Sequence, residues 1–304
     1  MSGEAMQKPR STTGFVYMWN GTSDGEGAYV DFSSGKTNVN DPRRVGIVAH
    51  NIRAMAPEQK PTLAKDGYEL IEHRSDLTAE ELLAGNTPEG HELIISKYYA
   101  ECKAIIHQIT GSELITPYIF RIRQNGAHPR DFSTRSVASS KMATSSLPIA
   151  HVDRDRLTLK HGIQELFGHE QADELMCTRA RWAQINIWRP IDEIVKSWPL
   201  VFVNHRAIKG WDYDSHMASV RPVNDPRVAI RGTKAQDSVL KEDPAYVYHY
   251  ASAMSNGEVF IFSSGDSDPG RVVPHSAFWD DSTSEHAPMR RSIEVRAFVF
   301  FNDE

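Results

Sequence analysis

The sequence predicts a mainly β fold with flanking helices, in which short strands form a sandwich or a barrel. Two observations favour this class. Many short segments rich in β-branched and aromatic residues are separated by Gly, Pro and Asp turns, and most of them follow a helical stretch in the N-terminal part. The 304 residues are 40% hydrophobic and 24% charged, a composition typical of a soluble globular protein with a sizeable core.

The first part of the chain is expected to lead into a single domain. Residues 1–13 are polar and are expected to form a disordered tail, so the domain spans residues 14–304. Its N-terminal part, residues 14–125, is expected to mix strands with helices. The β-rich stretches predict strands at 14–19, 28–32 and 45–49.

Two helices are expected before the main β region. Thr78 and Glu81 have the spacing of a capping box, which predicts a short helix that ends at Gly85. Apolar residues at intervals of three or four predict a longer helix over 94–109, with Gly111 at its C-cap. The pattern then becomes that of a strand, and we place the β core at residues 113–304.

Residues 125–146 form the longest stretch without periodicity, and Gly, Pro, Ser and Thr are frequent in it. Loops of this length inside a compact domain are usually functional or disordered. We therefore predict that residues 125–146 form a lid over a site built from the residues that follow.

Those following residues predict a metal site. His151 and Asp153 are two positions apart, and side chains i and i+2 of an extended segment point to one face, so both can bind one metal ion. His275, from a distant segment, is the expected third ligand. Two histidines and one carboxylate form the facial triad of non-haem Fe(II) oxygenases, which leaves positions for a co-substrate and dioxygen. The His-x-Asp pattern alone is weak, because about one or two such matches arise by chance in this composition.

The next β-rich stretch has two different faces. Apolar spacing predicts a helix over 159–167 that ends at Gly168, and residues 182–189 then alternate as a strand. One face of that strand is aliphatic, whereas the other either lines a ligand cavity or packs along a wet strand edge. The polar and aromatic face consists of Trp182, Gln184, Asn186 and Trp188. Later strands are expected at 199–203, 246–250, 258–262 and 292–301.

Charge and composition exclude several classes of function. A net charge of -6 and no long basic run argue against binding to nucleic acid. No secretory leader pattern and no stretch of membrane-spanning length occur, so we expect a cytoplasmic protein without a membrane partner. Cys102 and Cys177 are expected to be reduced thiols. No Gly-x-Gly-x-x-Gly, P-loop or Gly-x-Ser-x-Gly motif supports nucleotide binding or serine hydrolysis.

Several segments, taken together, resemble one family. They are residues 48–53 (Val-Ala-His-Asn-Ile-Arg), 66–70 (Asp-Gly-Tyr-Glu-Leu), 151–153 (His-Val-Asp), 186–191 (Asn-Ile-Trp-Arg-Pro-Ile), 198–200 (Trp-Pro-Leu), 274–278 (Pro-His-Ser-Ala-Phe) and 291–296 (Arg-Ser-Ile-Glu-Val-Arg). In order and spread they resemble the mostly fungal hydroxylase/desaturase family, which includes the aspergillic-acid-pathway oxygenase, gibberellin desaturase and a cephalosporin methoxylase component. The likeness runs from about residue 40 to the C-terminus.

The resemblance implies a double-stranded β-helix, the jelly roll of Fe(II)/2-oxoglutarate-dependent oxygenases, with His151, Asp153 and His275 at the metal positions. It also implies Fe(II) as cofactor and 2-oxoglutarate and dioxygen as co-substrates. The expected reaction is hydroxylation or desaturation of a C–H bond in a small specialised metabolite, with release of succinate and carbon dioxide. Because halogenases of this superfamily lack the carboxylate ligand, Asp153 argues against halogenation.

The co-substrate needs an anchor, and related oxygenases often place an Arg-x-Ser pair where Arg290 and Ser292 stand. A guanidinium suits this task because its planar fork gives two parallel hydrogen bonds to a carboxylate. Arg296 lies further along the same strand face and is the second choice. Asn186 is expected to help bind the cofactor, and the residues expected to line the substrate pocket are Gln184, Trp188 and Arg189.

Two departures from the family and two rival functions stay open. Arg291 stands where the family is expected to have an acidic residue, and Ser263 stands where lysine is frequent in the family. The substrate of a relative therefore cannot be assigned to this protein. One rival is a non-catalytic jelly-roll protein that binds a small molecule. The other is a hydrolase that uses the same three ligands with zinc. The sequence leaves the oligomeric state undetermined.

Overall fold

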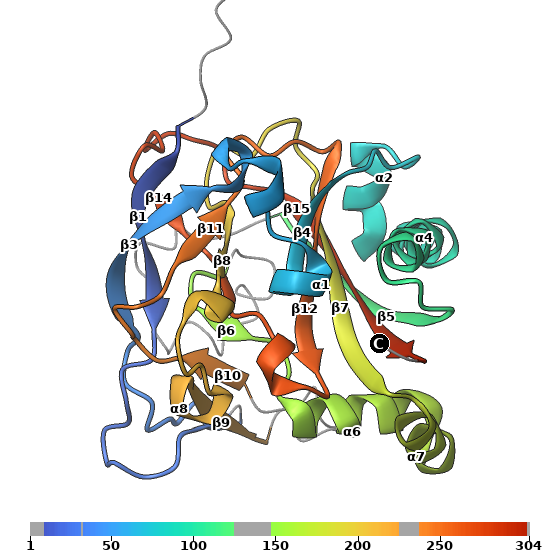
Figure 1. Ribbon diagram of the computed structural model, residues 1–304, viewed down its shortest axis with the longest axis horizontal. Helices are drawn as coiled ribbons and strands as arrows, with labels where there is room; N and C mark the ends of the chain where they lie inside the picture. Colours follow the sequence, from blue (N-terminus) through green and yellow to red (C-terminus); the bar gives the residue numbers. More distant parts are fainter. Residues whose placement is uncertain (1–8, 32, 125–146, 225–236, 303–304) are drawn as a thin grey trace, which may run out of the picture.

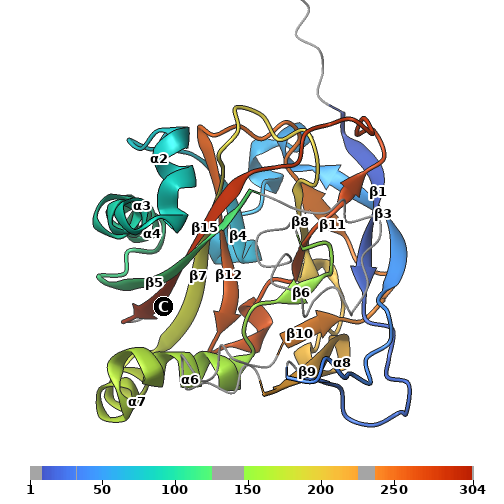
Figure 2. The ribbon, with the colours of Figure 1, turned by 180° about the vertical axis from the view of Figure 1, so that it is seen from behind.

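A computed structural model gives the arrangement of the chain and describes residues 9–31, 33–124, 147–224 and 237–302. Its strands form two sheets (Figures 1 and 2), and an aromatic and aliphatic cluster packs between them. The larger sheet consists of β1 (Ser11–Met18), β2 (Tyr29–Asp31), β3 (Arg43–Asn51), β6 (His151–Val152), β8 (Leu200–Val203), β9 (Met217–Val223), β10 (Asp237–Leu240), β11 (Tyr248–Tyr250), β13 (His275–Ala277) and β14 (Trp279–Asp280). Its order is β14-β1-β3-β11-β8-β13-β6-β10-β9-β2.

The smaller sheet has the order β4-β12-β7-β15-β5, and neighbouring strands in it are antiparallel. Its strands are β4 (Tyr68–Glu72), β5 (Leu114–Arg123), β7 (Arg181–Pro190), β12 (Glu258–Asp266) and β15 (Ser292–Phe301). The described helices are α1 (Leu63–Asp66), α2 (Ala79–Leu83), α3 (Pro88–Leu93), α4 (Tyr99–Thr110), α6 (Arg156–Phe167), α7 (His169–Thr178) and α8 (Tyr213–His216). A π-helical turn, Ile94–Tyr98, joins α3 to α4.

The smaller sheet separates a dry outer layer from a polar interior. Its aliphatic face is covered by α2, α3 and α4 (Figure 2), and Ile185 and Ile187 of β7 belong to one buried cluster with Cys102 and Ile106 of α4. The opposite face looks toward the larger sheet, where Trp188, Phe260 and Phe262 pack with Phe202 of β8. Alternation along β7 therefore directs Gln184 and Asn186 into the interior.

Much of the predicted local structure is present. Thr78 and Glu81 form both hydrogen bonds of the capping box of α2, and Gly111 ends α4 in the left-handed region at φ 68°. The strand predicted at 182–189 corresponds to β7, and the one at 292–301 to β15. No helix among the described segments is long and apolar enough to cross a membrane.

The structure corrects two expectations and confirms a third. Ser11 to Thr13 belong to β1, which pairs with β3 along its whole length, so the expected tail over residues 1–13 is too long. The β core does not begin at residue 113, because β1, β3 and β4 contribute to the two sheets. Gly168 does end α6, but a second helix, α7, follows it at once. The lid predicted over residues 125–146 lies outside the described residues.

Candidate metal centre

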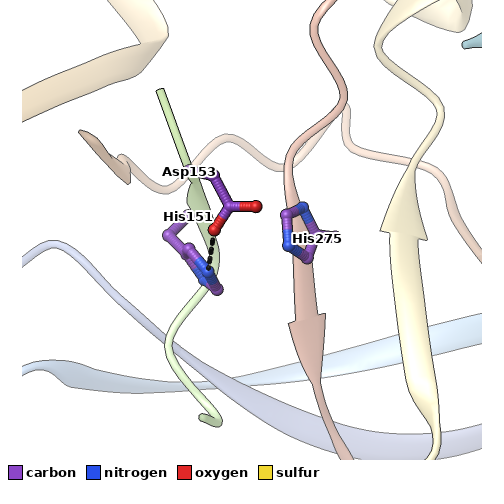
Figure 3. Close-up of side chains that lie close together, drawn as sticks. All are labelled: His151, Asp153 and His275. Atoms are coloured by element: carbon purple, nitrogen blue, oxygen red, sulfur yellow. Dashed lines mark ion pairs between the residues drawn. The ribbon is translucent and has the colours of Figure 1, made fainter. Parts of the chain in front are cut away.

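Strand pairing brings the three predicted metal ligands together. The two-residue strand β6 pairs with β13 so that His151 and His275 are register partners, and their ring centroids lie 4.6 Å apart. Asp153 follows β6 directly, and its Oδ1 lies 3.6 Å from Nε2 of His151. One ligand atom from each of the three residues lies within 4.8 Å of the others (Figure 3). This cluster has the composition of a facial triad.

Backbone carbonyls orient both imidazoles. Nδ1 of His151 lies 2.8 Å from the Ile149 carbonyl oxygen, and Nδ1 of His275 lies 3.1 Å from that of Val273. A carbonyl oxygen only accepts, so Nδ1 must be the protonated nitrogen of each ring. In the neutral form of each ring, Nε2 then carries the lone pair, which is the arrangement that a metal-ligating histidine needs.

Asp153 is held as a carboxylate by its neighbours. Nη2 of Arg296 donates to Oδ1 at 2.7 Å, and Nδ2 of Asn186 donates to Oδ2 at 2.7 Å. Burial alone would raise the pKa of Asp153, but the Arg296 guanidinium holds that pKa well below its usual range. The ligand carboxyl group is therefore ionised at neutral pH.

His275 is held neutral. Burial, and then the neighbouring His151, lower the pKa of His275 to about 4. Metal ions bind neutral imidazole and ionised carboxylate, so His275 and Asp153 both have the protonation state that ligation requires.

A chain of hydrogen bonds fixes the Asn186 amide. Ser264 Oγ donates to Oδ1 of Asn186 at 2.7 Å, and Gln184 Nε2 donates to Ser264 Oγ at 2.7 Å. A β-bulge between Ser263 and Gly265 brings Ser264 into this chain. Because Oδ1 of Asn186 accepts, its Nδ2 is the group that donates to Asp153. From the inner face of β7, Asn186 thus holds the Asp153 carboxylate in position, and Gln184 holds Asn186 through Ser264.

Ser292 is the first residue of β15, and Arg290 lies two residues before it. Both are buried, and Nε of Arg290 and Oγ of Ser292 have no hydrogen-bond partner within the described part of the chain. Nη1 of Arg290 donates to the Trp198 carbonyl oxygen, and its guanidinium carbon lies 4.8 Å from the ring centroid of Trp188. Burial, followed by Arg123, lowers the pKa of Arg290 to about 9. Two unsatisfied donors at one buried place fit a carboxylate.

Arg296 lies on the strand face that was predicted for it, whereas Arg189 lies elsewhere than expected. Arg296 pairs with Asp153 and Glu294, at 2.7 and 2.8 Å, which makes it a neighbour of the ligand carboxylate. Arg189 faces the outer layer, because it alternates with Trp188 along β7. Its Nε donates to the Tyr98 hydroxyl at 2.9 Å, and its Nη1 donates to the His73 carbonyl at 2.6 Å. The expectation that Arg189 lines the pocket is therefore wrong.

The two departures also have structural partners. Arg291 is bound to Asp192, with Nη2 and Oδ1 2.6 Å apart, at a half-buried position directly before β15. Ser263 is buried, and its hydroxyl lies 3.3 Å from Oδ2 of Asp266. Neither residue contacts His151, Asp153 or His275 through an interaction that the structure describes.

Sequence reasoning missed several charged residues beside Asp153. Arg121 and Arg123 of β5 and Glu294 of β15 lie close enough to Asp153 to act on its electrostatics. Their two-residue spacing along each strand was a usable signal, because it gives Arg121 and Arg123 one common face. The sequence did not say which face of β5 is the inner one.

Comparisons with known proteins agree with this geometry. A family model described as an oxidoreductase/YMDC permease-like domain matches residues 16–300. Oxidoreductase R1 from a Phoma species is 42% identical, over 96% of this chain and 98% of its own length. Hydroxylase/desaturase efuI from Hormonema carpetanum is 25% identical over 85% of this chain and 84% of its own. The predicted resemblance to proteins of the hydroxylase/desaturase type is confirmed.

A more distant relative has a solved structure. Fe(II)/2-oxoglutarate-dependent dioxygenase nvfI from Aspergillus novofumigatus is 23% identical over 78% of this chain and 79% of its own length. The structure of the iron and alpha-ketoglutarate-dependent endoperoxidase NvfI superimposes with a TM-score of 0.76 at 20% identity, covering 97% of this chain and 99% of that one. This likeness confirms the expected double-stranded β-helix.

Proposed function

Because the chain belongs to the oxidoreductase/YMDC permease-like domain family, we propose that it is a non-haem Fe(II)/2-oxoglutarate-dependent oxygenase that acts on a small organic molecule. The convergence of two imidazole Nε2 atoms and one ionised carboxylate carries this proposal. Three ligands on one side of a metal leave the other positions to 2-oxoglutarate and dioxygen.

The residues present fit both groups. His151, Asp153 and His275 would hold Fe(II), and the two carbonyl-oriented rings present the correct nitrogen. Nε of Arg290 and Oγ of Ser292 are buried donors without partners in the described ranges, and they would bind the distal carboxylate of 2-oxoglutarate. When bound, iron and 2-oxoglutarate supply the activation of dioxygen, with succinate and carbon dioxide as products.

The protein's own part is ligation, orientation and the exclusion of water. Arg296 and Asn186 keep the Asp153 carboxylate ionised and in place. Trp188 lies against the Arg290 guanidinium and, with the other aromatic residues between the sheets, makes that end of the interior apolar. An apolar wall strengthens the charge pairing of Arg290 with a bound carboxylate.

The test is an anaerobic titration of the purified protein with Fe(II) and 2-oxoglutarate. We expect the visible charge-transfer band of the iron–2-oxoglutarate complex to form in the wild type and to be absent in His275→Ala. Arg290→Ala should form the band only at higher 2-oxoglutarate concentrations. Arg291→Ala is the matched control, since this neighbouring arginine pairs with Asp192 at the surface.

Two rival functions give different results. A non-catalytic binding protein would take up no stoichiometric iron and would form no band. A zinc-dependent hydrolase would turn over without consuming dioxygen or 2-oxoglutarate. No band in a folded, iron-loaded wild type would overturn the oxygenase proposal.

The finer parts of the function stay predictions. Hydroxylation or desaturation of a specialised metabolite follows from the names of relatives such as efuI, and product analysis by mass spectrometry distinguishes the two. A cytoplasmic location and the absence of nucleic-acid and membrane partners rest on the sequence alone.

A further inference from the structure

Guanidinium groups gather on the inner face of the smaller sheet, beside the metal centre. In the register of β5 with β15, Arg121 lies opposite Glu294 and Arg123 lies opposite Ser292. Ile122, between the two arginines, packs on the outer face with the helices. The positive charge of Arg296, and then burial, lower the pKa of Arg121 to about 9, so Arg121 lies in a strongly positive field.

The carboxylates of this region are already bound by other groups. Oε1 of Glu294 accepts a hydrogen bond from Nε of Arg296 at 2.8 Å. The two oxygens of Asp153 accept hydrogen bonds from Arg296 and Asn186. Arg121 makes no hydrogen bond or ion pair with the residues that the structure describes. Its five donors are therefore available to a ligand.

Arg121 lies among other charged groups. Of the described residues, the guanidiniums of Arg123 and Arg296 and the carboxylates of Asp153 and Glu294 act on it. Cations in a partly dry interior need a counter-ion, because their lost hydration must be replaced.

We propose that Arg121 forms a second anion subsite that binds a carboxylate of the substrate, so that the substrate is an organic acid. This inference rests on the proposed oxygenase function. The planar guanidinium fork binds a carboxylate through two parallel hydrogen bonds, which fixes orientation as well as position.

The subsite differs from the co-substrate anchor in its place along the sheet. Arg290 and Ser292 lie at the start of β15, whereas Arg121 is level with Glu294, one inward position nearer to Arg296 and Asp153. A substrate carboxylate held there is tethered next to the metal ligands. Such a tether restricts which C–H bonds of the substrate come within reach of the metal.

The test uses the full chain under anaerobic conditions, loaded with Fe(II) and saturating 2-oxoglutarate so that the Arg290 site is occupied. Octanoate is the probe, and octanamide is its neutral counterpart of the same length. Affinity is read from the rise in melting temperature with probe concentration. We expect octanoate to bind at least about tenfold more tightly than octanamide, because only octanoate gains a charge-assisted pair.

Variants separate the two anion sites. Arg121→Gln should lose the preference for octanoate and keep the iron–2-oxoglutarate band, whereas Arg290→Gln should need more 2-oxoglutarate and keep the preference. Arg121→Lys retains the charge and should retain part of the preference for octanoate. This variant also tests the subsite if Arg121→Gln folds poorly. Arg291→Gln is the matched control and should behave as the wild type.

Three results would overturn the subsite. They are equal binding of octanoate and octanamide to the wild type, an unchanged preference in Arg121→Gln, and loss of the 2-oxoglutarate band in Arg121→Gln but not in Arg290→Gln. The last would make Arg121 the co-substrate anchor. Failure of the oxygenase proposal is recognised separately, since the wild type would then form no band with Fe(II) and 2-oxoglutarate.

Discussion

Nη2 of Arg296 lies 2.7 Å from Oδ1 of Asp153, so a buried guanidinium neutralises the carboxylate that we propose as an iron ligand. The same guanidinium bonds Glu294 through Nε, which makes Arg296 the bridge between two buried acids. A neighbour that hydrogen-bonds a ligand carboxylate fixes its orientation and so contributes to metal affinity.

Replacing Arg296 with glutamine is expected to lower Fe(II) affinity by about 10- to 100-fold, because Asp153 loses its orienting partner. Anaerobic competition with a chelator measures this affinity. Arg181→Gln is the control, because it breaks another buried ion pair, in which Nη2 of Arg181 lies 2.8 Å from Oδ2 of Asp266. This control variant should lose stability without a change in iron affinity. If the folded Arg296→Gln variant had the iron affinity of the wild type, Arg296 would have no part in metal binding.

Arg189→Met is expected to destabilise the fold and to leave 2-oxoglutarate binding unchanged. The substitution leaves the carbonyls of His73 and Asn256 and the hydroxyl of Tyr98 without their buried donor. The cost should be about 3 kcal/mol or more in the free energy of unfolding, measured with urea. If Arg189→Met were instead as stable as the wild type but bound 2-oxoglutarate poorly, Arg189 would line the pocket after all.

The contrast between Asn186 and Arg189 shows how far sequence patterns reach. Alternation along 182–189 was visible, and it correctly separated a polar face from an aliphatic one. Arg189 was grouped with the polar residues because of its type, although its position in the alternation assigns it to the aliphatic face. On that face, the hydroxyl of Tyr98 in the π-helical turn and the carbonyl of His73, which follows β4, accept its hydrogen bonds.

The metal ligands illustrate a second limit. His151 and Asp153 could be paired from their spacing, but β6 is two residues long and β13 three, too short for any periodicity. Such strands exist only because their neighbours in the sheet pair with them. His275 could therefore be named from the sequence only as a candidate from a distant segment, and the register that sets it opposite His151 required the fold.

Gly14→Ala is expected to destabilise the edge of the larger sheet. A Cβ atom at Gly14 would lie 1.9 Å from the carbonyl oxygen of Trp279 in the neighbouring β14, so the strands must move apart. We expect a loss of about 1 to 3 kcal/mol in the free energy of unfolding, measured with urea. Gly46→Ala is the control, because the nearest atom to its Cβ is 4.0 Å away. Equal stability of the two variants would contradict the close approach of β1 and β14.

His249 is expected to make stability depend on pH. Burial, and then His50, lower the pKa of His249 from 6.5 to about 4, and Nδ1 of His249 lies 2.6 Å from the Tyr68 hydroxyl. Because the unfolded chain binds this proton more tightly, folding stability is full above pH 6.5 and falls as the pH drops to 4. The loss attributable to His249 should be about 3 kcal/mol. In urea titrations across this range, His249→Gln should therefore lose less stability than the wild type, whereas the exposed-site control His286→Gln should match it. Equal pH slopes in wild type and His249→Gln would show that His249 is not the titrating group.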